Sequence, residues 1–222
     1  MVRCPKCSEA QGPQLCCLKC GAPLGAELDS FAALGLERNL VIDLARLEQS
    51  YHERGRQVHP DRFAAESAGV RAASLKSTAN LTRAYRALRD PVSRGLYWLT
   101  LHGRKLSDDN QRVPADLAAT VFTIQEKLAE LREIDAAVGT AELRDNVEGE
   151  RREVQAAADK ALTQLEANFA AWDHRAEDGE EFARETAKEA LFEALKSVLA
   201  RIAYLRTLLR DIDRALEIAQ AA

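Results

Sequence analysis

Aromatic residues, glycine and proline are all scarce in this chain of 222 residues. Aromatics make up 5% of the sequence, which holds 11 glycines and 6 prolines. Alanine, leucine, glutamate and arginine are abundant instead. Because strands favour aromatic and β-branched residues while these four favour helices, the composition predicts an all-α fold and weighs against a β-sandwich.

A strong net charge and a long apolar run are also absent. The formal net charge is −4, so no chain-wide field points to nucleic acid or to an acidic membrane surface. No apolar run approaches the roughly 20 residues that a membrane-spanning helix needs. The opening residues Met1-Val2-Arg3-Cys4 look like neither a secretory signal nor a transit peptide. We therefore expect any recognition by charge to be local, with no membrane and no nucleic acid as a partner.

Cysteine is missing after residue 20, although five cysteines come before that point. A secreted domain held by disulfides would spread its cysteines through the fold, whereas two CxxC pairs at one end are typical of a metal site in a reducing compartment. Four thiolates in tetrahedral geometry suit zinc. We expect a cytoplasmic protein in which residues 1–26 form a small metal-binding knuckle. Its predicted ligands are Cys4, Cys7, Cys17 and Cys20.

Several questions about this knuckle stay open in the sequence. Cys16 is an alternative to Cys17, but three residues would then separate it from Cys20, so Cys17 is assigned. Iron in a rubredoxin-like site is an alternative to zinc. A redox dithiol needs only one pair and usually a surrounding α/β fold, which makes it the weaker interpretation. Dimerisation and contact with a partner protein are both open as roles for the knuckle.

Residues 28–103 are predicted to form a compact helical domain. Apolar residues recur at helical spacing and indicate helices over about 40–57, 70–90 and 91–102. The residues that mark the first two helices are Leu40, Leu44, Leu47, Tyr51 and Val58, then Val70, Leu75, Leu81, Ala84, Tyr85 and Leu88. Pro60 ends the first helix, because it disfavours helical geometry at the residue before it and has no N–H to donate.

The tripeptide His59-Pro60-Asp61 lies between the first two of these helices. Its simplest interpretation is a turn that ends one helix and caps the next. Arg46, Arg54 and Arg56 precede it, however, so a nearly neutral protein carries a locally basic helix there. Basic side chains beside a rigid exposed turn can steer an acidic partner surface into register. The turn is therefore a candidate binding site.

Residues 104–114 are polar and predict a linker, and residues 115–222 are predicted to form a three-helix bundle. The first helix is expected to begin near residue 117. The second is expected to run from about 143 to 172 and the third from about 180 to 219, with a break at 173–179 between them. Their apolar seams are Leu117, Val121, Ile124, Leu128, Leu131 and Val138; Val154, Ala158, Ala161, Leu165 and Trp172; and Leu195, Val198, Ile202, Leu205, Leu209, Ile212 and Leu216.

Phe122, Glu126 and Glu130 share a second face of the first bundle helix, because they are spaced i, i+4, i+8. A large aromatic residue beside two carboxylates is unusual on a solvated helix. Tyr204 likewise falls off the seam of the last helix. The alternative is that Phe122 and Tyr204 only widen the core stripe, as often happens in globular bundles.

Four stretches together resemble a J domain. They are Phe31-x-x-Leu34-Gly35-Leu36, Leu47-x-x-x-Tyr51, His59-Pro60-Asp61-Arg62-Phe63 and Ala84-Tyr85-x-x-Leu88-x-Asp90-Pro91-x-x-Arg94. The continuation Tyr97-Trp98-Leu99-Thr100-Leu101-His102-Gly103 resembles the HscB family, the J co-chaperones of iron–sulfur cluster assembly. A general DnaJ protein would continue into a Gly/Phe-rich linker and four CxxCxGxG motifs, which this sequence lacks. The likeness runs through residues 28–222, and the CxxC pairs resemble the N-terminal extension of some HscB relatives.

This resemblance implies an adaptor that performs no chemistry of its own. It would bring an IscU-like scaffold protein, on which the cluster is built, to a DnaK/HscA-class chaperone and stimulate ATP hydrolysis by that chaperone. The implied chaperone-binding residues are His59, Pro60, Asp61, Arg46, Arg54 and Arg56. The implied scaffold-binding residues are Ala118, Ala119, Phe122, Glu126, Glu130 and Tyr204. The chain departs from the family in smaller side chains at 118 and 119, in threonine at 82 and 123, and in a longer segment over 176–193.

Other functions remain as alternatives. A zinc-ribbon protein that binds nucleic acid would need cations and aromatics in the knuckle, which holds only Arg3, Lys6 and Lys19 as cations and no aromatic residue. A general J protein for other clients is the second alternative. An enzyme is not expected, because the four histidines are scattered and the sequence contains no phosphate-binding loop.

Overall fold

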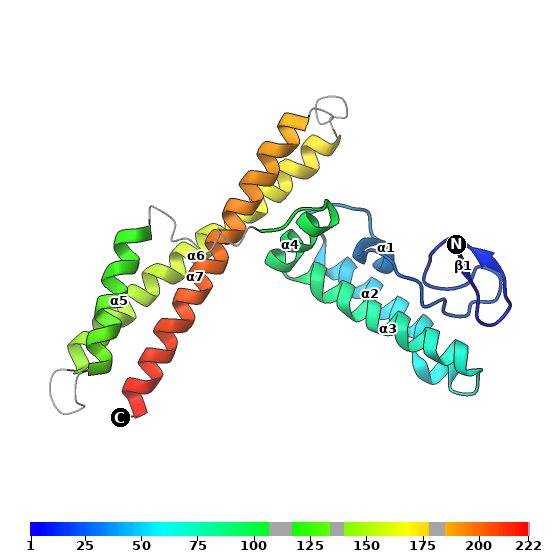
Figure 1. The fold of residues 1–222 in the computed structure, drawn as a ribbon, viewed down its shortest axis with the longest axis horizontal. Coiled ribbons are helices and arrows are strands. Elements are labelled where there is room, and N and C mark those ends of the chain that lie inside the picture. Colours follow the sequence, from blue (N-terminus) through cyan, green and yellow to red (C-terminus); the bar gives the residue numbers. More distant parts are fainter. Residues whose placement is uncertain (107–116, 134–139, 178–184, 222) are drawn as a thin grey trace. The chain divides into compact units, whose positions relative to one another are not determined.

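A computed structural model describes residues 1–106, 117–133, 140–177 and 185–221 (Figure 1). The chain divides into two compact units, Met1–Trp98 and Leu99–Ala222. The division falls inside a helix, and the predicted linker over 104–114 lies largely outside the described residues. The predicted fold class is confirmed: a small four-cysteine knuckle precedes a helical hairpin, and a three-helix bundle follows.

The knuckle, residues 1–26, is built on two very short strands. β1 (Val2–Arg3) and β2 (Ala10–Gln11) pair antiparallel, and an isolated bridge joins Cys16 to Pro23. The buried cluster beneath them consists of small or apolar residues, namely Cys4, Cys17, Ala22, Leu24 and Ala26. So little apolar surface cannot hold a folded segment by itself, which is why such knuckles normally need a metal.

A helical hairpin follows the knuckle within the first unit. Its elements are α1 (Ser30–Leu34), α2 (Leu44–Val58), the 3₁₀ turn η1 (Pro60–Phe63), α3 (Ala68–Arg89) and α4 (Pro91–Leu101). Asp43 caps α2 by accepting hydrogen bonds from the N–H groups of its first turn, and Ser67 caps α3 in the same way. α2 therefore begins at Leu44, four residues later than the sequence predicts.

The core of this unit contains most of the predicted apolar stripe, with two corrections. The buried members are Leu40, Leu47, Val58, Val70, Leu81, Ala84 and Leu88, together with Phe31 and Leu34 of α1. Leu44 and Leu75 are wrong as core predictions, since they are 51% and 60% exposed. Leu44 is the first residue of its helix. Ser74 takes the inward position beside Leu75, because its hydroxyl donates a buried hydrogen bond to the carbonyl of Val58.

Arg94, on α4, fixes the end of the hairpin from inside. Its guanidinium is buried, and it donates to the carbonyl of Leu88 at 2.9 Å and to that of Leu40 at 2.7 Å. A buried cation is costly unless its donors are satisfied. Here the guanidinium donates to two backbone carbonyls, one at the end of α3 and one in the loop before α2.

The second unit is the three-helix bundle, made of α5 (Ala118–Glu133), α6 (Thr140–Glu177) and α7 (Glu185–Ala221). α6 packs along α7, and α5 packs against both (Figure 1). Its core residues are Val121, Ile124, Leu128, Val147, Val154, Ala158, Ala161, Leu165, Phe169, Trp172, Phe192, Leu195, Leu199, Ile202, Leu205, Leu208, Ile212, Ala215 and Leu216.

Three predictions for this bundle need correction, and two fall outside what is described. α6 continues through Asp173 to Glu177, so the break expected at Asp173 is wrong. On α7, Val198 and Leu209 are only half-buried, while Leu199 and Leu208 occupy the core. Each neighbouring pair is apolar, so spacing alone cannot choose between its members. The side chains of Leu131 and Val138 lie outside the described part of the chain.

An aromatic cluster ties the start of this unit to the α6–α7 pair. The ring of Trp172 lies 4.7 Å from that of Phe192, and His102 approaches both. Arg104 lies 4.2 Å above the Phe192 ring and pairs with Glu189. The described part of the segment 176–193 is thus largely the first turns of α7, which this cluster holds in place.

Replacing Leu205 by alanine should lower the free energy of unfolding of the bundle by about 2–5 kcal/mol, because the leucine is fully buried on α7. Ile218 on the same helix is 55% exposed, so Ile218→Ala should change it by only about 0.5 kcal/mol. Urea unfolding followed by circular dichroism measures both. Equal midpoints for the two variants would contradict this placement of the core.

Candidate functional site

The predicted tripeptide lies at the tip of the α2–α3 hairpin. His59 ends α2 and caps η1, and its Nδ1 accepts a hydrogen bond from the N–H of Asp61 at 3.4 Å. The side chains of His59 and Asp61 are 55% and 90% exposed, and His59 Nδ1 lies 3.5 Å from Asp61 Oδ2. The turn therefore presents an almost fully exposed carboxylate to solvent.

The base of the turn is fixed from within the hairpin. The carbonyl of Val58, which directly precedes His59, accepts hydrogen bonds from Ser74 Oγ at 2.6 Å and from Thr78 Oγ1 at 3.3 Å. Val58 and Ser74 are fully buried, so water does not compete for these bonds. An exposed tip on a rigid base suits a docking loop, because little ordering entropy is left to lose on binding.

The three arginines predicted beside the turn have different environments. Arg46 and Arg54 line one groove of about 380 Å³ along α2. The Arg54 guanidinium is half-buried, donates to the carbonyl of Ala33 at 3.3 Å and lies directly over Gly35, so it also holds the end of α1. Arg56 is exposed, and its carbonyl accepts a hydrogen bond from the Arg62 guanidinium at 2.9 Å. Arg46 and Arg56 are thus the more accessible of the three.

The second predicted surface follows the outer side of α5. Val121, Ile124 and Leu128 of this helix are buried, and the predicted patch lies on the opposite side. All five of its α5 members are exposed: Ala118, Ala119, Phe122, Glu126 and Glu130. Phe122 is 65% exposed, so it does not widen the core.

Tyr204, the sixth predicted member of this surface, lies on α7 and is half-buried. Burial, together with the nearby carboxylate of Asp211, raises the pKa of its hydroxyl. Tyr204 is therefore partly a core residue, and the α5 residues form the more accessible part of the predicted surface. We refer to Ala118, Ala119, Phe122, Glu126 and Glu130 as the α5 patch.

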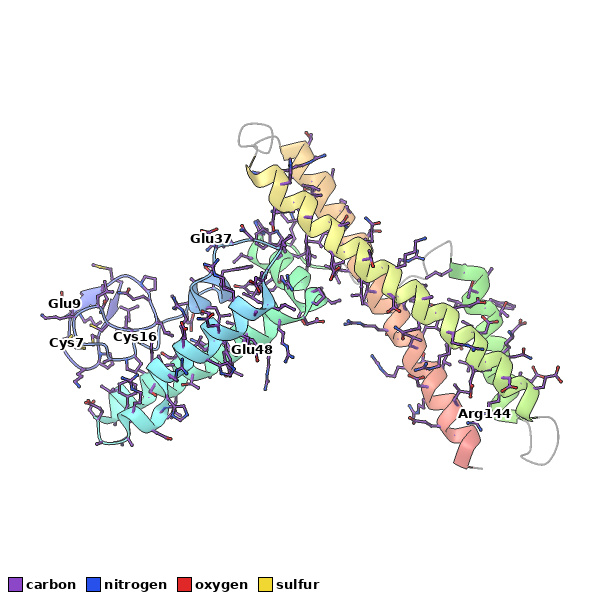
Figure 2. The ribbon with its side chains drawn as sticks, turned by 180° about the vertical axis from the view of Figure 1, so that it is seen from behind. Cys7, Glu9, Cys16, Glu37, Glu48 and Arg144 are labelled. Atoms are coloured by element: carbon purple, nitrogen blue, oxygen red, sulfur yellow. The ribbon has the colours of Figure 1, made fainter. Side chains whose placement is uncertain are left out.

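The four predicted metal ligands converge in the knuckle. The Sγ atoms of Cys4, Cys7, Cys17 and Cys20 all lie within 4.8 Å of one another. Cys4 and Cys20 approach to 3.5 Å, and Cys7 and Cys17 approach to 3.7 Å. Cys16 is not part of this group, and burial raises the pKa of its thiol. Figure 2 shows Cys7 and Cys16 in the knuckle beside the helical hairpin.

The thiols of this cluster do not ionise independently of one another. Burial acts to raise the pKa of Cys17, but the nearby Gln11 amide, two backbone N–H groups and the Cys7 thiol lower it to about 6. The N–H of Ala22 acts to lower the pKa of Cys20, but burial and the neighbouring thiols raise it to about 12. A second thiolate is thus unfavourable beside the first, and a bound cation would let all four ionise.

The surroundings of the four sulfurs fit a metal ion. The amide nitrogen of Gln11 is buried and has no hydrogen-bond partner in the described part of the chain, and this side chain lowers the pKa of the Cys17 thiol. The N–H of Lys6 points at Cys4 Sγ at 3.4 Å. Donors directed at thiolates are what the outer shell of a four-sulfur metal site provides. The cluster can therefore hold a metal ion, and its four sulfurs suit zinc and iron alike.

Comparison with known proteins identifies the chain's family. It is 32% identical over 136 residues to a co-chaperone protein HscB homolog of Chromobacterium violaceum, an alignment that covers 60% of this chain and 76% of that protein. This chain belongs to the HscB family. It is also 31% identical over 153 residues to human iron–sulfur cluster co-chaperone protein HscB, which covers 65% of this chain and 60% of the human protein. An alignment with co-chaperone protein HscB of Proteus mirabilis gives 34% identity over 84 residues, 38% of this chain and 49% of that protein.

Solved HscB structures share this fold. The crystal structure of human co-chaperone protein HscB matches with a TM-score of 0.68 at 24% identity, over 96% of this chain and 97% of that one. The structure of chaperone HscB from Vibrio cholerae matches with a TM-score of 0.60 at 18% identity, over 86% and 99% of the two chains. No family model matches the chain. Among the described residues, no helix is long and apolar enough to cross a membrane.

The residues that anchor the 59–61 turn are not evident from the sequence. Ser74 and Thr78 are spaced i, i+4 and look like ordinary polar residues of a half-exposed helix. Their signal in the sequence is weak: two small hydroxyl residues fall where a core leucine is otherwise expected. Only their pairing with the carbonyl of Val58, 16 and 20 residues away, identifies what they do.

Proposed function

We propose that this chain is a J-type co-chaperone that brings an IscU-like iron–sulfur scaffold to a DnaK/HscA-class chaperone and stimulates ATP hydrolysis by that chaperone. The observation that carries the proposal is the turn at 59–61, exposed at its tip and fixed at its base, in a member of the HscB family. The adaptor would itself perform no chemistry. It would act through two binding surfaces on two separate units.

The chaperone would bind the turn and the basic helix before it. His59, Pro60 and Asp61 would form the central contact, with Arg46 and Arg56 steering an acidic surface and Arg54 contributing from the groove it shares with Arg46. Exposed charges of this kind affect association rate and register more than affinity. The exposed Asp61 carboxylate is the strongest single feature of this surface.

The scaffold would bind the α5 patch. Phe122 supplies an exposed apolar anchor, and Glu126 and Glu130 supply negative charge one and two turns further along the helix. Tyr204 would contribute from α7 with the part of its ring that remains exposed. The alanines at 118 and 119 offer less apolar area than larger residues would, so Phe122 should dominate the contact.

The knuckle would hold zinc as a structural ion. Its four sulfurs converge without any other ligand type, and zinc favours a closed tetrahedral set of this kind. A reducing compartment such as the cytoplasm would keep the thiols available. Dimerisation through the knuckle is a further proposal that follows from its exposed side, where Leu18 is 85% exposed.

The test of the proposed function is the steady-state ATPase of a DnaK/HscA-class chaperone with this protein, with an IscU-like scaffold, and with both. We expect stimulation by this protein alone and greater stimulation when the scaffold is also present. No stimulation in any of these mixtures would overturn the proposal. Stimulation by this protein that the scaffold never increases would favour a general J protein.

Replacing Phe122 by alanine should weaken scaffold binding by about 10- to 30-fold, since a central aromatic anchor contributes roughly 2 kcal/mol. Ile218→Ala removes another apolar side chain of similar exposure, 55%, from the same unit and should leave binding unchanged. Isothermal titration with the purified scaffold measures both variants. Binding by Phe122→Ala at wild-type affinity would show that the α5 patch is not the scaffold site.

The nucleic-acid alternative gains no support from the knuckle. Two of the three cations within residues 1–26 are paired, Lys6 with Glu66 and Lys19 with Glu9. Binding to phosphates draws on basic side chains whose charge is not already neutralised. These pairs leave Arg3 as the main cationic side chain of the knuckle.

A further inference from the structure

The start of α3 is contacted on one side by the knuckle. Gly69, Ala73, Ser77 and Asn80 recur at helical spacing and share one face of this helix. A Cβ at Gly69 would lie 3.7 Å from Pro5 of the knuckle, and the Nδ2 group of Asn80 donates to the carbonyl of Ala26 at 3.2 Å. The knuckle therefore lies along the first three turns of α3.

Gly25 makes a second close contact with α3. It is buried, its N–H donates to the buried hydroxyl of Ser77 at 3.2 Å, and its φ of +59° is left-handed. A Cβ at this position would lie 3.2 Å from the Cα of Ala73. Glycine is thus required for two reasons, backbone geometry and the close approach to α3.

An ion pair joins the knuckle to the segment between the turn and α3. Lys6 Nζ lies 2.5 Å from Glu66 Oε1, and Glu66 comes five residues after Asp61. Lys6 is also in the middle of the first CxxC turn, so its position depends on the metal site. Lys19, in the second CxxC turn, pairs instead with Glu9 inside the knuckle.

A neighbouring face of the same helix turns holds the base of the 59–61 turn. Ser74 and Thr78, which donate to the carbonyl of Val58, are each one residue after a knuckle-facing position. A displacement of α3 at Ala73 and Ser77 would therefore act directly on the residue before His59. The knuckle and the base of the turn thus contact the same two turns of one helix.

We infer that the metal-loaded knuckle positions the 59–61 turn for the chaperone, with Gly25 and Lys6 as positioning residues. This inference rests on the proposed function for its activity readout. The knuckle has only a small apolar cluster of its own, so its contacts with α3 persist only while the metal holds it folded. Loss of those contacts would populate arrangements of the turn that the chaperone binds poorly. Apparent affinity falls in proportion to the competent fraction.

The test compares full-length variants by two measurements. Gly25→Ala strains the backbone and crowds Ala73, and Gly103→Ala is its matched control because Gly103 has φ +69° with open space around it. Lys6→Met removes the bridging ion pair, and Lys19→Met removes the pair within the knuckle. Hydrogen exchange of the amides of residues 71–80 is one measurement. The concentration of this protein that gives half-maximal stimulation of a DnaK/HscA-class ATPase is the other.

We expect the amides of residues 71–80 to exchange faster in Gly25→Ala, and in wild type stripped of metal by a chelator. The concentration of each that gives half-maximal stimulation should rise by about 3- to 10-fold. Maximal stimulation should stay near that of wild type, because His59 and Asp61 themselves are unchanged. Lys6→Met should show a smaller shift in the same direction, and the two controls should show none. Protection of residues 71–80 unchanged by both metal removal and Gly25→Ala would overturn the inference. If wild type does not stimulate the ATPase at all, the proposed function is wrong. The exchange measurement then still decides whether the knuckle stabilises α3.

Discussion

Replacing Asp61 by asparagine is expected to abolish stimulation of the chaperone ATPase while leaving the fold intact. The Asp61 side chain is 90% exposed, and His59 Nδ1 lies 3.5 Å from its Oδ2. The substitution keeps the shape of the side chain and removes its charge. Stability should therefore change by no more than about 0.5 kcal/mol, as for other surface substitutions.

The expected loss of stimulation is large because the carboxylate would be buried against a cation of the chaperone in the complex. Truncating one partner of a buried, hydrogen-bonded charge pair costs about 2–5 kcal/mol, or roughly 30- to several-thousand-fold in apparent affinity. Asp145→Asn on α6 is a matched control, since Asp145 is exposed on the other unit. Stimulation by Asp61→Asn at wild-type level would remove the turn from the proposed mechanism.

The parts of this molecule that sequence predicts well are those fixed by short-range pattern. The two CxxC pairs, the proline that ends α2 and the i, i+4 spacing of Phe122 and Glu126 each depend on residues close together in the chain. The four sulfurs converge because each CxxC turn brings two of them together, so that only one long-range approach is left to form. Local geometry of this kind leaves few alternatives.

What the sequence does not reveal depends on choices between equivalent residues or on distant contacts. Val198 and Leu199 are both apolar, and only packing within the bundle places Leu199 in the core. The pair of Lys6 and Glu66 joins residues 60 positions apart, and either side chain alone looks like an ordinary surface charge. Arg54 illustrates a third case. Its place beside the turn predicts a contact with a partner, yet its guanidinium also donates a hydrogen bond to the carbonyl of Ala33 at the end of α1.

The bundle shows the same limit at its helix ends. His174 and Arg175 look like residues of a turn, yet they belong to the last turns of α6. Cations near the C-terminus of a helix interact favourably with its dipole, so the polar stretch continues the helix instead of ending it. Composition alone does not separate a polar helix end from a loop.

Replacing Cys17 by serine is expected to abolish tight metal binding and unfold the knuckle, while Cys16→Ser is expected to preserve both. The two cysteines are adjacent in sequence, but only Cys17 lies in the group of four converging sulfurs. Structural zinc contributes about 10–16 kcal/mol in small four-ligand domains, so each ligand accounts for roughly 2.5–4 kcal/mol, or about 100- to 1,000-fold in affinity. The knuckle has no comparable source of stability, since its strands hold two residues each.

Competition with a chromophoric chelator, together with the sulfur-to-metal charge-transfer band of the cobalt-substituted protein, measures both variants. Wild type and Cys16→Ser should bind one metal ion per chain with a four-thiolate spectrum, whereas Cys17→Ser should lose the tight site. Metal binding should also weaken as the pH falls, because all four sulfurs must be ionised to bind the metal and protons then compete for them. Cys20 is especially sensitive, since burial and the neighbouring thiols raise its pKa to about 12. The α-helical circular dichroism signal should be nearly unchanged in Cys17→Ser, because residues 1–26 contain no described helix. Tight binding by Cys17→Ser with loss in Cys16→Ser would reverse the ligand assignment.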